Sequence, residues 1–590
     1  MRIKVREFTG ITDNIIEMIL RMRGIPKDRV GNFLFPDDSM KPDYSLLDNI
    51  GDATALLKKH IDNDSEILII ADSDMDGYTS SGIMYQFIVN DLKYDKDKVD
   101  YYVHKGKVHG IPEEHVLEHK PQLLIVPDAG TSEYSIHKNI SDNGTDILIL
   151  DHHLADRYSE FAVTINNQLS DNFKWKGLAG ANIVHLFCEA YSDAHVEGKI
   201  DTDKYYNEAA IGGISDRAPL TDEGMFYYMH KGSRNVRNPF FKEIIANSRN
   251  MIEGEPLTPK MISWNIAPLI NSMTRRPDKH EDTKLVVDAI MGQEYEVYNT
   301  RLKDSFSVAK EGLRKATNIR SQQSTKVKKY MEQLEERIEE LKTHENQVLI
   351  VNATDVVKES SYTGLVATKL AEKYRRPTLV LKYYKEENKL TGSGRNFANS
   401  PLFDFRQTLL DTEKFEFALG HSSSFGCSIQ IDNAMSIIDV LNEQLADVEY
   451  NDLTYEVDLS YSQKPDAEDI LTIAQHEHIW GAGLESPIIH VSDIILDKKD
   501  IKFIGAKGNV WKLDMGSVEG VLFNMTEQQK LELTKHESDK IVVEIVGECG
   551  INSYNGQNRP QINIKDFSAV EYTDEMYNPF GGMDIDVLPF

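Results

Sequence analysis

Three short apolar runs constrain the fold of this chain more than any other feature of its sequence. They are Ile67–Ile70, Leu123–Val126 and Ile147–Leu150, and longer amphipathic segments separate them. Each run has the length of a strand that is buried on both faces, and the alternation with longer segments is typical of βαβ units. The sequence therefore predicts an α/β fold in which helices cover a parallel sheet.

Acidic residues follow each of the three runs. Asp72, Asp74 and Asp76 come after the first run, Asp128 after the second, and Asp151–His153 after the third. Functional groups of an open parallel sheet lie at the carboxyl ends of its strands, so we expect these side chains to converge on one site. Carboxylates and imidazoles suit Mn²⁺, Mg²⁺ or Zn²⁺, and one bridging carboxylate can hold two cations about 3.5–4 Å apart.

Each of these acidic clusters also has a simpler interpretation. An Asp after a strand is often a helix cap or a turn residue. A DxDxDG string also occurs in EF-hand loops, but here the twelfth residue counted from Asp72 is Ile83 rather than Glu. Three clusters at three strand ends are far more specific than any one of them.

Composition limits the remaining possibilities. A chain of 590 residues is too long for one hydrophobic core, so several domains are expected. The net charge of −29 argues against a general polyanion binder, although metal-binding carboxylates add to this count and a local basic groove can still guide a strand. No apolar stretch has the length of a membrane span, and no apolar signal core follows the basic N-terminus, so we expect a cytoplasmic protein without a membrane partner.

The sequence pattern that indicates secondary structure changes several times along the chain. Residues from about Gly10 to Ile61 are predicted to be helical, and the polar segment from about Tyr295 to His344 is predicted to be a helix or a helix pair. A second α/β pattern follows from Gln347 to Val448, and β-rich sequence that fits a small barrel begins beyond Asp452. We expect N-terminal helices and a catalytic domain at 1–240, followed by a helical region with a long connector helix at 241–345. A smaller α/β domain at 346–450, a barrel at 451–575 and a flexible acidic tail at 576–590 complete the chain.

Four segments resemble the motifs of the DHH phosphoesterase superfamily, including the DHH tripeptide itself. They are Asp72–Gly77, Asp128, Asp151–His153 and Gly213–Asp216. Further segments resemble the RecJ branch of that superfamily: Pro268–Arg275, Thr363–Pro377, Gly392–Arg395, Leu419–Gly426 and Arg559–Asp566. The similarity covers nearly the whole chain. It implies a DHH domain and a DHH-associated domain joined by a long helix, followed by a barrel of OB type.

The resemblance also implies roles for individual residues. Two divalent cations, Mn²⁺ or Mg²⁺, would be held by Asp72, Asp74, Asp76, Asp128, His152 and Asp216. Asp128 would bridge the cations, Asp151 would orient the neighbouring imidazoles, and His153 would contact the scissile phosphate or assist proton transfer. The substrate strand would be held by Arg275, Ser393, Arg395 and His421. Aromatic side chains of the barrel that are candidates for base stacking are Phe503, Trp511, Phe523 and Tyr554.

Four places depart from the RecJ pattern without removing a metal ligand. Ala129 stands where the second motif usually has Asn, and Leu419 stands where the G-G-H motif has its first Gly. The histidine usual before the Thr363–Pro377 segment is replaced near Glu359, and the N-P-N-Q motif appears as Ile165–Gln168. These departures indicate a divergent member with altered end recognition or rate, such as a viral or accessory form, which would act in the host cytoplasm if it is viral.

The implied activity is that of a 5′→3′ exonuclease on single-stranded DNA in DNA repair, recombination or replication. Two alternatives stay open. One is a DHH hydrolase of short oligonucleotides or cyclic dinucleotides, although such relatives usually lack the C-terminal barrel. The other is a non-catalytic replication scaffold, although such proteins lose the metal ligands that this chain keeps.

The last residues carry acidic side chains followed by Pro-Phe, which resembles the tip of bacterial single-stranded-DNA-binding proteins. One interpretation is that Asp584–Phe590 binds a replication or repair protein, or competes with a single-stranded-DNA-binding protein for its partner. The other interpretation is a frayed tail with a chance ending.

Overall fold

The computed structural model describes residues 1–450, 453–554 and 557–573, so the predicted tail at 576–590 lies outside the described residues. The chain forms two compact units. The large unit comprises the described part of 32–451 and 481–484, and the small unit comprises 1–31 and the described parts of 452–480 and 485–590. Among the residues that are described, no helix combines the length and apolar character needed to cross a membrane.

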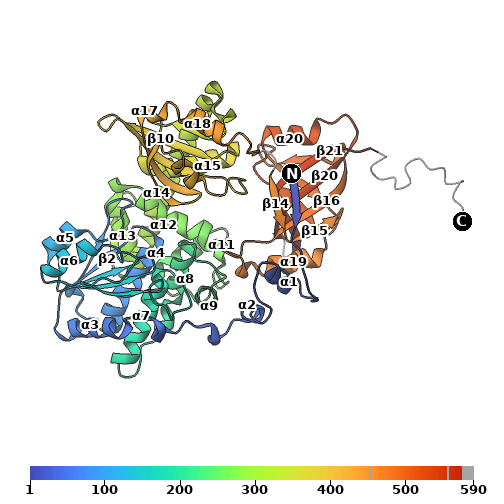
Figure 1. The fold of residues 1–590 in the computed structure, drawn as a ribbon. Helices are drawn as coiled ribbons and strands as arrows, with labels where there is room; N and C mark the ends of the chain where they lie inside the picture. Colours follow the sequence, from blue (N-terminus) through green and yellow to red (C-terminus); the bar gives the residue numbers. More distant parts are fainter. Residues whose placement is uncertain (451–452, 555–556, 574–590) are drawn as a thin grey trace, which may run out of the picture. The chain divides into compact units, whose positions relative to one another are not determined.

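The first lobe of the large unit is the predicted parallel sheet, with helices against both of its faces (Figure 1). Every neighbouring strand pair in it runs parallel. The three apolar runs become β2, β4 and β5, which confirms the predicted fold class. In sheet order the strands are β3 Val99–Val103, β2 Ile67–Ala71, β4 Leu123–Pro127, β5 Asp146–Asp151 and β6 Val163–Asn166.

The central strands are apolar because helices cover both of their faces. On one face, Leu68 and Ile70 belong to a core that includes Val116 of α5 and Ile140 of α6. Helices α3, α4 and α7 pack against the strands from the other side (Figure 1). These helices are α3 Ile50–Asp62, α4 Met75–Gln86, α5 Glu113–His119, α6 Tyr134–Asp142 and α7 Gly180–His195.

A group of shorter helices follows the sheet and supports α4. Helix α8 packs against α4, α7 and α9, and α12 and α13 pack against the long helix α14. Their bounds are α8 Tyr206–Ser215, α9 Glu223–Gly232, α10 Pro239–Ala246, α11 Pro259–Met261, α12 Ala267–Thr274 and α13 His280–Ile290, and α2 Val30–Leu34 precedes the sheet.

The long connector is a single helix, and the prediction that helix extends from Tyr295 is wrong. Residues Glu296–Asn299 (β7) and Asp304–Ser307 (β8) form an antiparallel hairpin, and α14 runs over Val308–Leu341. The Asn299 side-chain oxygen accepts hydrogen bonds from the backbone N–H groups of the two turn residues Arg301 and Leu302 at 3.1 and 3.0 Å. An Asn side chain therefore shapes this turn without the Gly or Pro that would have marked it in the sequence.

The second lobe of the large unit is a smaller α/β domain with a mixed sheet. Strands β9 and β10 run parallel, and the other neighbouring pairs run antiparallel. In sheet order the strands are β12 Phe415–His421, β13 Ser424–Gln430, β11 Lys389–Arg395, β10 Thr378–Tyr384 and β9 Leu349–Asn352. Its helices are α15 Thr363–Tyr374, α16 Phe405–Leu410, α17 Ile431–Ala434 and α18 Ile437–Gln444.

The small unit is β-rich, as predicted for the C-terminal region. A seven-stranded sheet has the order β15 Leu459–Ser462, β16 Ile488–Asp497, β20 Lys540–Tyr554, β21 Gln557–Glu571, β19 Glu519–Leu522, β18 Val510–Asp514 and β17 Lys502–Ile504. Three helices accompany it: α1 Ile15–Met22, α19 Ala467–Gln475 and α20 Glu527–Thr534. Trp511 is fully buried against Phe567 in its core, so it is not free to stack on a base.

Residues 1–31 belong to the small unit, although their sequence groups them with the catalytic domain that follows. Strand β1 (Arg2–Val5) pairs in parallel with β14 (Thr454–Val457). The Arg23 guanidinium donates two hydrogen bonds of 3.0 and 2.8 Å to the carboxylate of Asp458. The Asp458 side chain has no exposed surface. The two residues lie 435 positions apart in the sequence, so no local sequence pattern indicates that they pair.

Replacing Arg23 with Ala leaves a buried carboxylate without its main partner. Removing one member of a buried ion pair typically costs 3–5 kcal/mol, so we expect the free energy of unfolding of the small unit to fall by about 3 kcal/mol. Hydrogen exchange read by mass spectrometry would measure this loss separately in each unit. Lys4→Ala is the matched control, because the Lys4–Glu456 pair has side chains that are 69% and 45% exposed and surface pairs contribute about 0–1 kcal/mol. Equal protection in both variants would contradict the assignment.

Candidate metal centre

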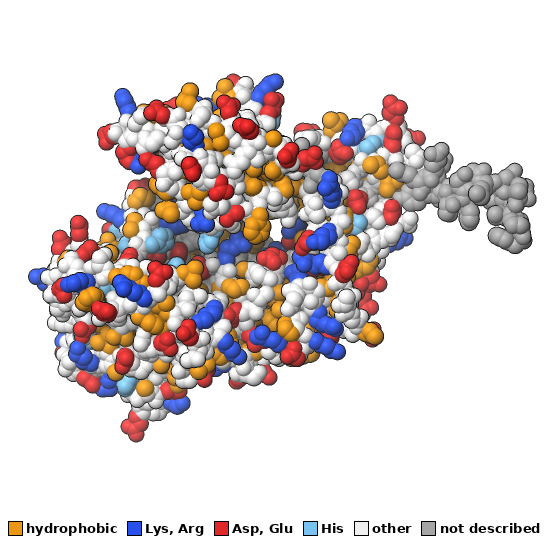
Figure 2. All heavy atoms as spheres, viewed as in Figure 1, with side chains coloured by type: hydrophobic (Ala, Val, Ile, Leu, Met, Phe, Trp, Pro, Cys, Tyr) orange, Lys and Arg blue, Asp and Glu red, His pale blue; other side chains and the backbone are white. Residues whose placement is uncertain are grey.

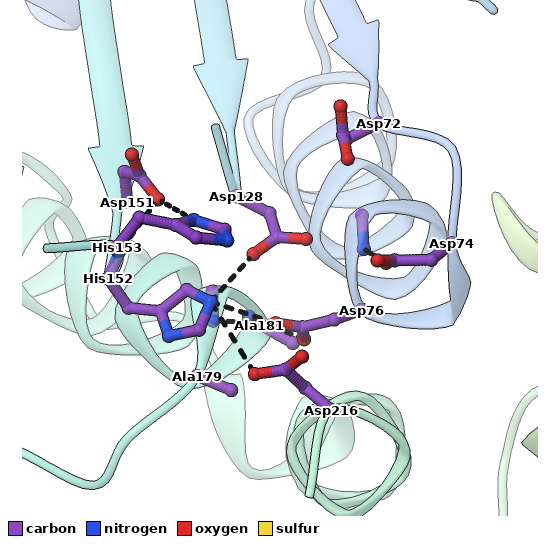
Figure 3. A network of polar contacts seen from close by, with 12 residues as sticks. Asp72, Asp74, Asp76, Asp128, Asp151, His152, His153, Ala179, Ala181 and Asp216 are labelled. Atoms are coloured by element: carbon purple, nitrogen blue, oxygen red, sulfur yellow. Dashed lines mark hydrogen bonds and ion pairs between the residues drawn. The ribbon is translucent and has the colours of Figure 1, made fainter. Parts of the chain in front are cut away.

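The turn from β2 into α4 presents three aspartates at the carboxyl edge of the sheet (Figure 3). Asp72 directly follows the strand, Asp74 caps the helix by accepting a 3.1 Å hydrogen bond from the Gly77 N–H, and Asp76 lies in the first helical turn. A Cβ atom on Gly77 would lie 2.6 Å from the backbone oxygen of Asp72. Only glycine therefore lets the helix start this close to the strand end.

Asp76 faces the beginning of α7. Its two carboxylate oxygens accept hydrogen bonds from the backbone N–H groups of Gly180 and Ala181 at 2.8 and 3.1 Å. These N–H groups have no partner within the helix, and the helix dipole favours negative charge at this end. The contact fixes a buried carboxylate without using a cationic side chain.

Asp128 and His152 meet at the centre of the site (Figure 3). Asp128 has a left-handed φ of 63°, and a Cβ atom on Gly180 would lie 2.5 Å from its Oδ1. His152 Nε2 lies 3.1 Å from Asp128 Oδ1, 3.7 Å from Asp216 Oδ2 and 3.8 Å from Asp76 Oδ2. Neither His152 Nε2 nor Asp128 Oδ1 has a hydrogen-bond partner among the described residues, although both are buried. A carboxylate oxygen and an imidazole nitrogen that are buried side by side without a hydrogen bond fit the ligands of a bound cation.

Asp151 organises the histidine pair. Its Oδ1 accepts hydrogen bonds from the backbone N–H of His152 at 2.7 Å and from His153 Nδ1 at 2.8 Å. Its Oδ2 accepts from the backbone N–H and the hydroxyl of Thr131 at 3.1 and 2.7 Å. Asp151 therefore holds the His153 ring and the backbone of His152, and its role in orienting both imidazoles stays a prediction.

Burial and like charge together shift the ionisation of the cluster. Burial raises the pKa of Asp128 well above its ordinary value, and the neighbouring Asp76 adds to the rise. Burial also raises the pKa of Asp74, and it raises the pKa of Asp216 to about 8. At Asp151 burial is opposed and outweighed by the hydrogen bond from His153, so the pKa of Asp151 lies below its ordinary range. At Asp128, Asp74 and Asp216 burial is not outweighed in this way, and a nearby positive charge would lower their pKa values.

The possible ligand atoms fall into three groups, and within each group they lie within 4.8 Å of one another. One group is Asp76, His152 and Asp216, and a second, which shares His152, is Asp128 with Asp151, His152 and His153. Asp72, Asp74 and His109 form the third. The sequence interpretation did not single out His109, because it belongs to none of the motifs and lies in a loop 37 positions after Asp72.

Cationic side chains lie next to the carboxylates. A cavity of about 90 Å³ is lined by Asp74, Asp76 and Asp216, and also by Lys107 and Arg275. Partial desolvation and the nearby Arg275 lower the pKa of Lys107. Burial and Arg275 likewise lower the pKa of Arg395 on β11. The basic side chains of Lys107, Arg275 and Arg395 are thus close enough to repel one another beside an acidic site. The sequence interpretation had missed Lys107. Figure 2 shows histidine and basic side chains gathered in a hollow of the large unit.

The other predicted substrate residues lie on the second lobe. Ser393 shares a 2.9 Å hydrogen bond with the Thr363 hydroxyl, and a Cβ atom on Gly364 would lie 2.6 Å from the Arg395 guanidinium. His421 ends β12 opposite Ser424, with an exposed side chain. Within the described part of the chain, His421 has no hydrogen bond or ion pair with the carboxylates, so its substrate role stays a prediction.

Comparisons with known proteins agree with this geometry. Residues 66–214 match the DHH family N-terminal domain, and residues 458–566 match the RecJ OB domain. The chain is 30% identical over 559 residues to the putative SPbeta prophage-derived single-strand DNA-specific exonuclease YorK of Bacillus subtilis, with 94% of this chain and 95% of YorK covered. It is 26% identical to the single-stranded-DNA-specific exonuclease RecJ of the same organism, over 92% of this chain and 66% of RecJ.

The solved structures show the same fold. The structure of RecJ in complex with Mn²⁺ from Thermus thermophilus superimposes with a TM-score of 0.71 at 16% identity and covers 97% of this chain and 80% of that RecJ chain. The fold and the edge of carboxylates and histidines thus define a DHH-type α/β protein. The chain belongs to the RecJ-like family of DHH proteins, as its motifs indicated.

Asp128→Asn should make the metal-free protein more stable. The raised pKa of Asp128 means that ionisation opposes folding, so metal-free stability falls as pH rises from the ordinary carboxyl pKa toward the raised one. We expect the variant to melt about 2 °C or more above the wild type in EDTA at pH 7.5, and to lose less stability between pH 5 and 8. Mn²⁺ should raise the Tm of the wild type much more than that of the variant. Scanning calorimetry measures both effects, and a less stable variant in EDTA would refute this account of the charges.

Proposed function

We propose that this chain hydrolyses phosphodiester bonds of single-stranded DNA with two divalent cations, Mn²⁺ or Mg²⁺. The observation that carries the proposal is the set of ligand groups at one sheet edge, with buried ligand atoms that make no hydrogen bond within the described residues. Asp72 and Asp74 would hold one cation, Asp76, His152 and Asp216 the other, and Asp128 would bridge them. The Mn²⁺ and Mg²⁺ complexes of Thermus thermophilus RecJ support this choice of ions.

The cations, when bound, activate a water and neutralise charge on the phosphate. The protein side chains hold and orient the reacting groups. Asp151 takes the hydrogen bond from His153 Nδ1, so the ring is fixed and its Nε2 is left for the substrate. The His153 side chain is 61% exposed, which lets it contact a phosphate that enters the site. From this position Nε2 would donate to a phosphate oxygen or pass a proton to the leaving oxygen.

Basic side chains of the protein would hold the substrate strand. Lys107 and Arg275 line the cavity beside Asp74, and Arg395 lies close to both of them. Guanidinium groups make paired hydrogen bonds to phosphate without reading base sequence, which suits an enzyme that degrades any strand. Ser393 and His421 complete the predicted set. In the small unit Phe523 is 57% exposed and is the better stacking candidate, since Trp511 is buried.

The choice of substrate rests on the small unit and on the relatives. Its match to the RecJ OB domain favours a single strand over a dinucleotide, because OB folds bind extended single strands. The complete ligand set disfavours a non-catalytic scaffold. The names of YorK and RecJ support single-stranded DNA as substrate. We propose a role in DNA repair, recombination or replication from the family resemblance alone. We propose 5′→3′ polarity from the family alone, and action in the cytoplasm, which is the host's if the chain is viral.

The test is degradation of a labelled oligonucleotide by the full chain with Mn²⁺. We expect loss of a 5′ label from single strands and much slower attack on duplex or dinucleotide. Asp128→Ala should lower the rate about 10³-fold, because the metal site contributes several kcal/mol of charge stabilisation and 1.36 kcal/mol is tenfold. Asp142→Ala is the matched control, since its carboxylate pairs with Lys138 on the surface of α6, where both side chains are 57% exposed.

Other outcomes of this assay would replace the proposal. Cleavage of dinucleotides alone would move the chain to the hydrolases of short oligonucleotides. No cleavage of any substrate would favour the scaffold, and unchanged activity in Asp128→Ala would mean that this site does not carry the reaction.

We also propose that the segment Asp584–Phe590 binds a basic pocket on a replication or repair protein, because it combines acidic side chains with a Phe. Deleting it should reduce co-purification of such a protein and leave the rate on naked single strands unchanged. An unchanged set of co-purified proteins would overturn this part of the proposal.

A further inference from the structure

The loop between β3 and α5 is held tightly around Asp72. The Gly110 N–H donates a 3.0 Å hydrogen bond to Asp72 Oδ1, and the Gly110 carbonyl contacts His104 Nε2 at 2.9 Å. Gly110 has a left-handed φ of 85°, and a Cβ atom there would lie 2.1 Å from the Glu133 carboxylate. That carboxylate accepts a hydrogen bond from the next backbone N–H. The position of His109, one residue earlier, is therefore set by its surroundings.

This loop places the His109 ring on the metal edge. His109 Nδ1 lies 2.5 Å from Asp72 Oδ2, and the ligand atoms of His109, Asp72 and Asp74 all lie within 4.8 Å of one another. Two neighbouring ligands of one cation with bonds of about 2.1 Å stand about 3 Å apart. The side chain is 48% exposed, so an ion can reach it.

We infer that His109 is a ligand of one of the two cations, together with Asp72 and Asp74. The other cation takes His152 with Asp76 and Asp216. The inference rests on the proposed two-metal function and adds to it a residue outside the four motifs. Each cation then has one nitrogen donor. Imidazole suits transition-metal ions, whereas Mg²⁺ prefers oxygen, so His109 makes this position selective for Mn²⁺ over Mg²⁺.

His109 could instead act only as a hydrogen-bond donor that orients Asp72. The two roles are separable by His109→Asn. An Asn amide can donate to the Asp72 carboxylate in place of Nδ1–H, but it offers a cation no imidazole nitrogen. His109→Ala removes both functions. His119→Ala in α5 is the matched control, because it removes an imidazole near the same loop but outside the ligand groups.

The experiment measures Mn²⁺ binding to the full chain without DNA, by titration followed by electron paramagnetic resonance, with Mg²⁺ as competitor. We expect two Mn²⁺ per wild-type chain and ¹⁴N couplings from two histidines in the spin-echo modulation. His109→Asn and His109→Ala should both weaken one Mn²⁺ site by about 10–100-fold. They should lose one ¹⁴N coupling and leave Mg²⁺ affinity within a few-fold. His119→Ala should match the wild type.

The outcomes distinguish this inference from the proposed function. If His109→Asn binds Mn²⁺ with wild-type affinity and keeps both ¹⁴N couplings, His109 is a positioning donor and the inference fails while the function stands. A wild-type chain that binds no Mn²⁺ overturns both. Since His109→Asn keeps the contact with Asp72, an unchanged Tm in EDTA shows that lost binding is not lost folding.

Discussion

Repulsion among buried carboxylates is the constraint on which this structure depends. Asp72, Asp76 and Asp128 are each only 2% exposed, and Asp74 and Asp216 lie beside them. Such a cluster is unfavourable unless hydrogen bonds or positive charge compensate it. The backbone supplies part of the compensation through the N–H groups of Gly110, Gly180 and Ala181. The negative charge that remains would be compensated by bound metal ions. The buried carboxylates that would hold the metal are therefore the same groups that destabilise the metal-free site.

The glycines at this edge follow from the same constraint. A side chain at two of these glycines would collide with a carboxylate, because a Cβ on Gly180 or Gly212 would lie within 2.5 Å of an aspartate oxygen. Compensation by backbone has a consequence for substrate binding, because it uses no cationic side chain. Lys107 and Arg275, which line the cavity, and Arg395 near them remain available to a phosphate.

Local patterns in the sequence predicted the elements that local physics determines. The runs that became β2, β4 and β5 are apolar because both faces are covered, and the acidic residues after them converge because parallel strands end at one edge. The hairpin of Glu296–Ser307 was missed because an Asn side chain shapes its turn in a polar segment that resembles a helix. His109 and Lys107 were missed because tertiary contacts, not motif spacing, bring their loop to Asp72. Metal ligation by any of these residues remains a proposal.

The pairing of β1 with β14 makes the small unit discontinuous in the chain. During synthesis Arg2–Val5 leaves the ribosome long before Thr454–Val457 exists, so its strand edge and Arg23 must wait unpaired while the large unit is made. At about 5–20 residues per second, this delay is about 20 to 90 seconds. The large unit can therefore fold first, and a nascent chain interrupted before residue 454 would carry an exposed strand edge at its beginning, a known route to aggregation.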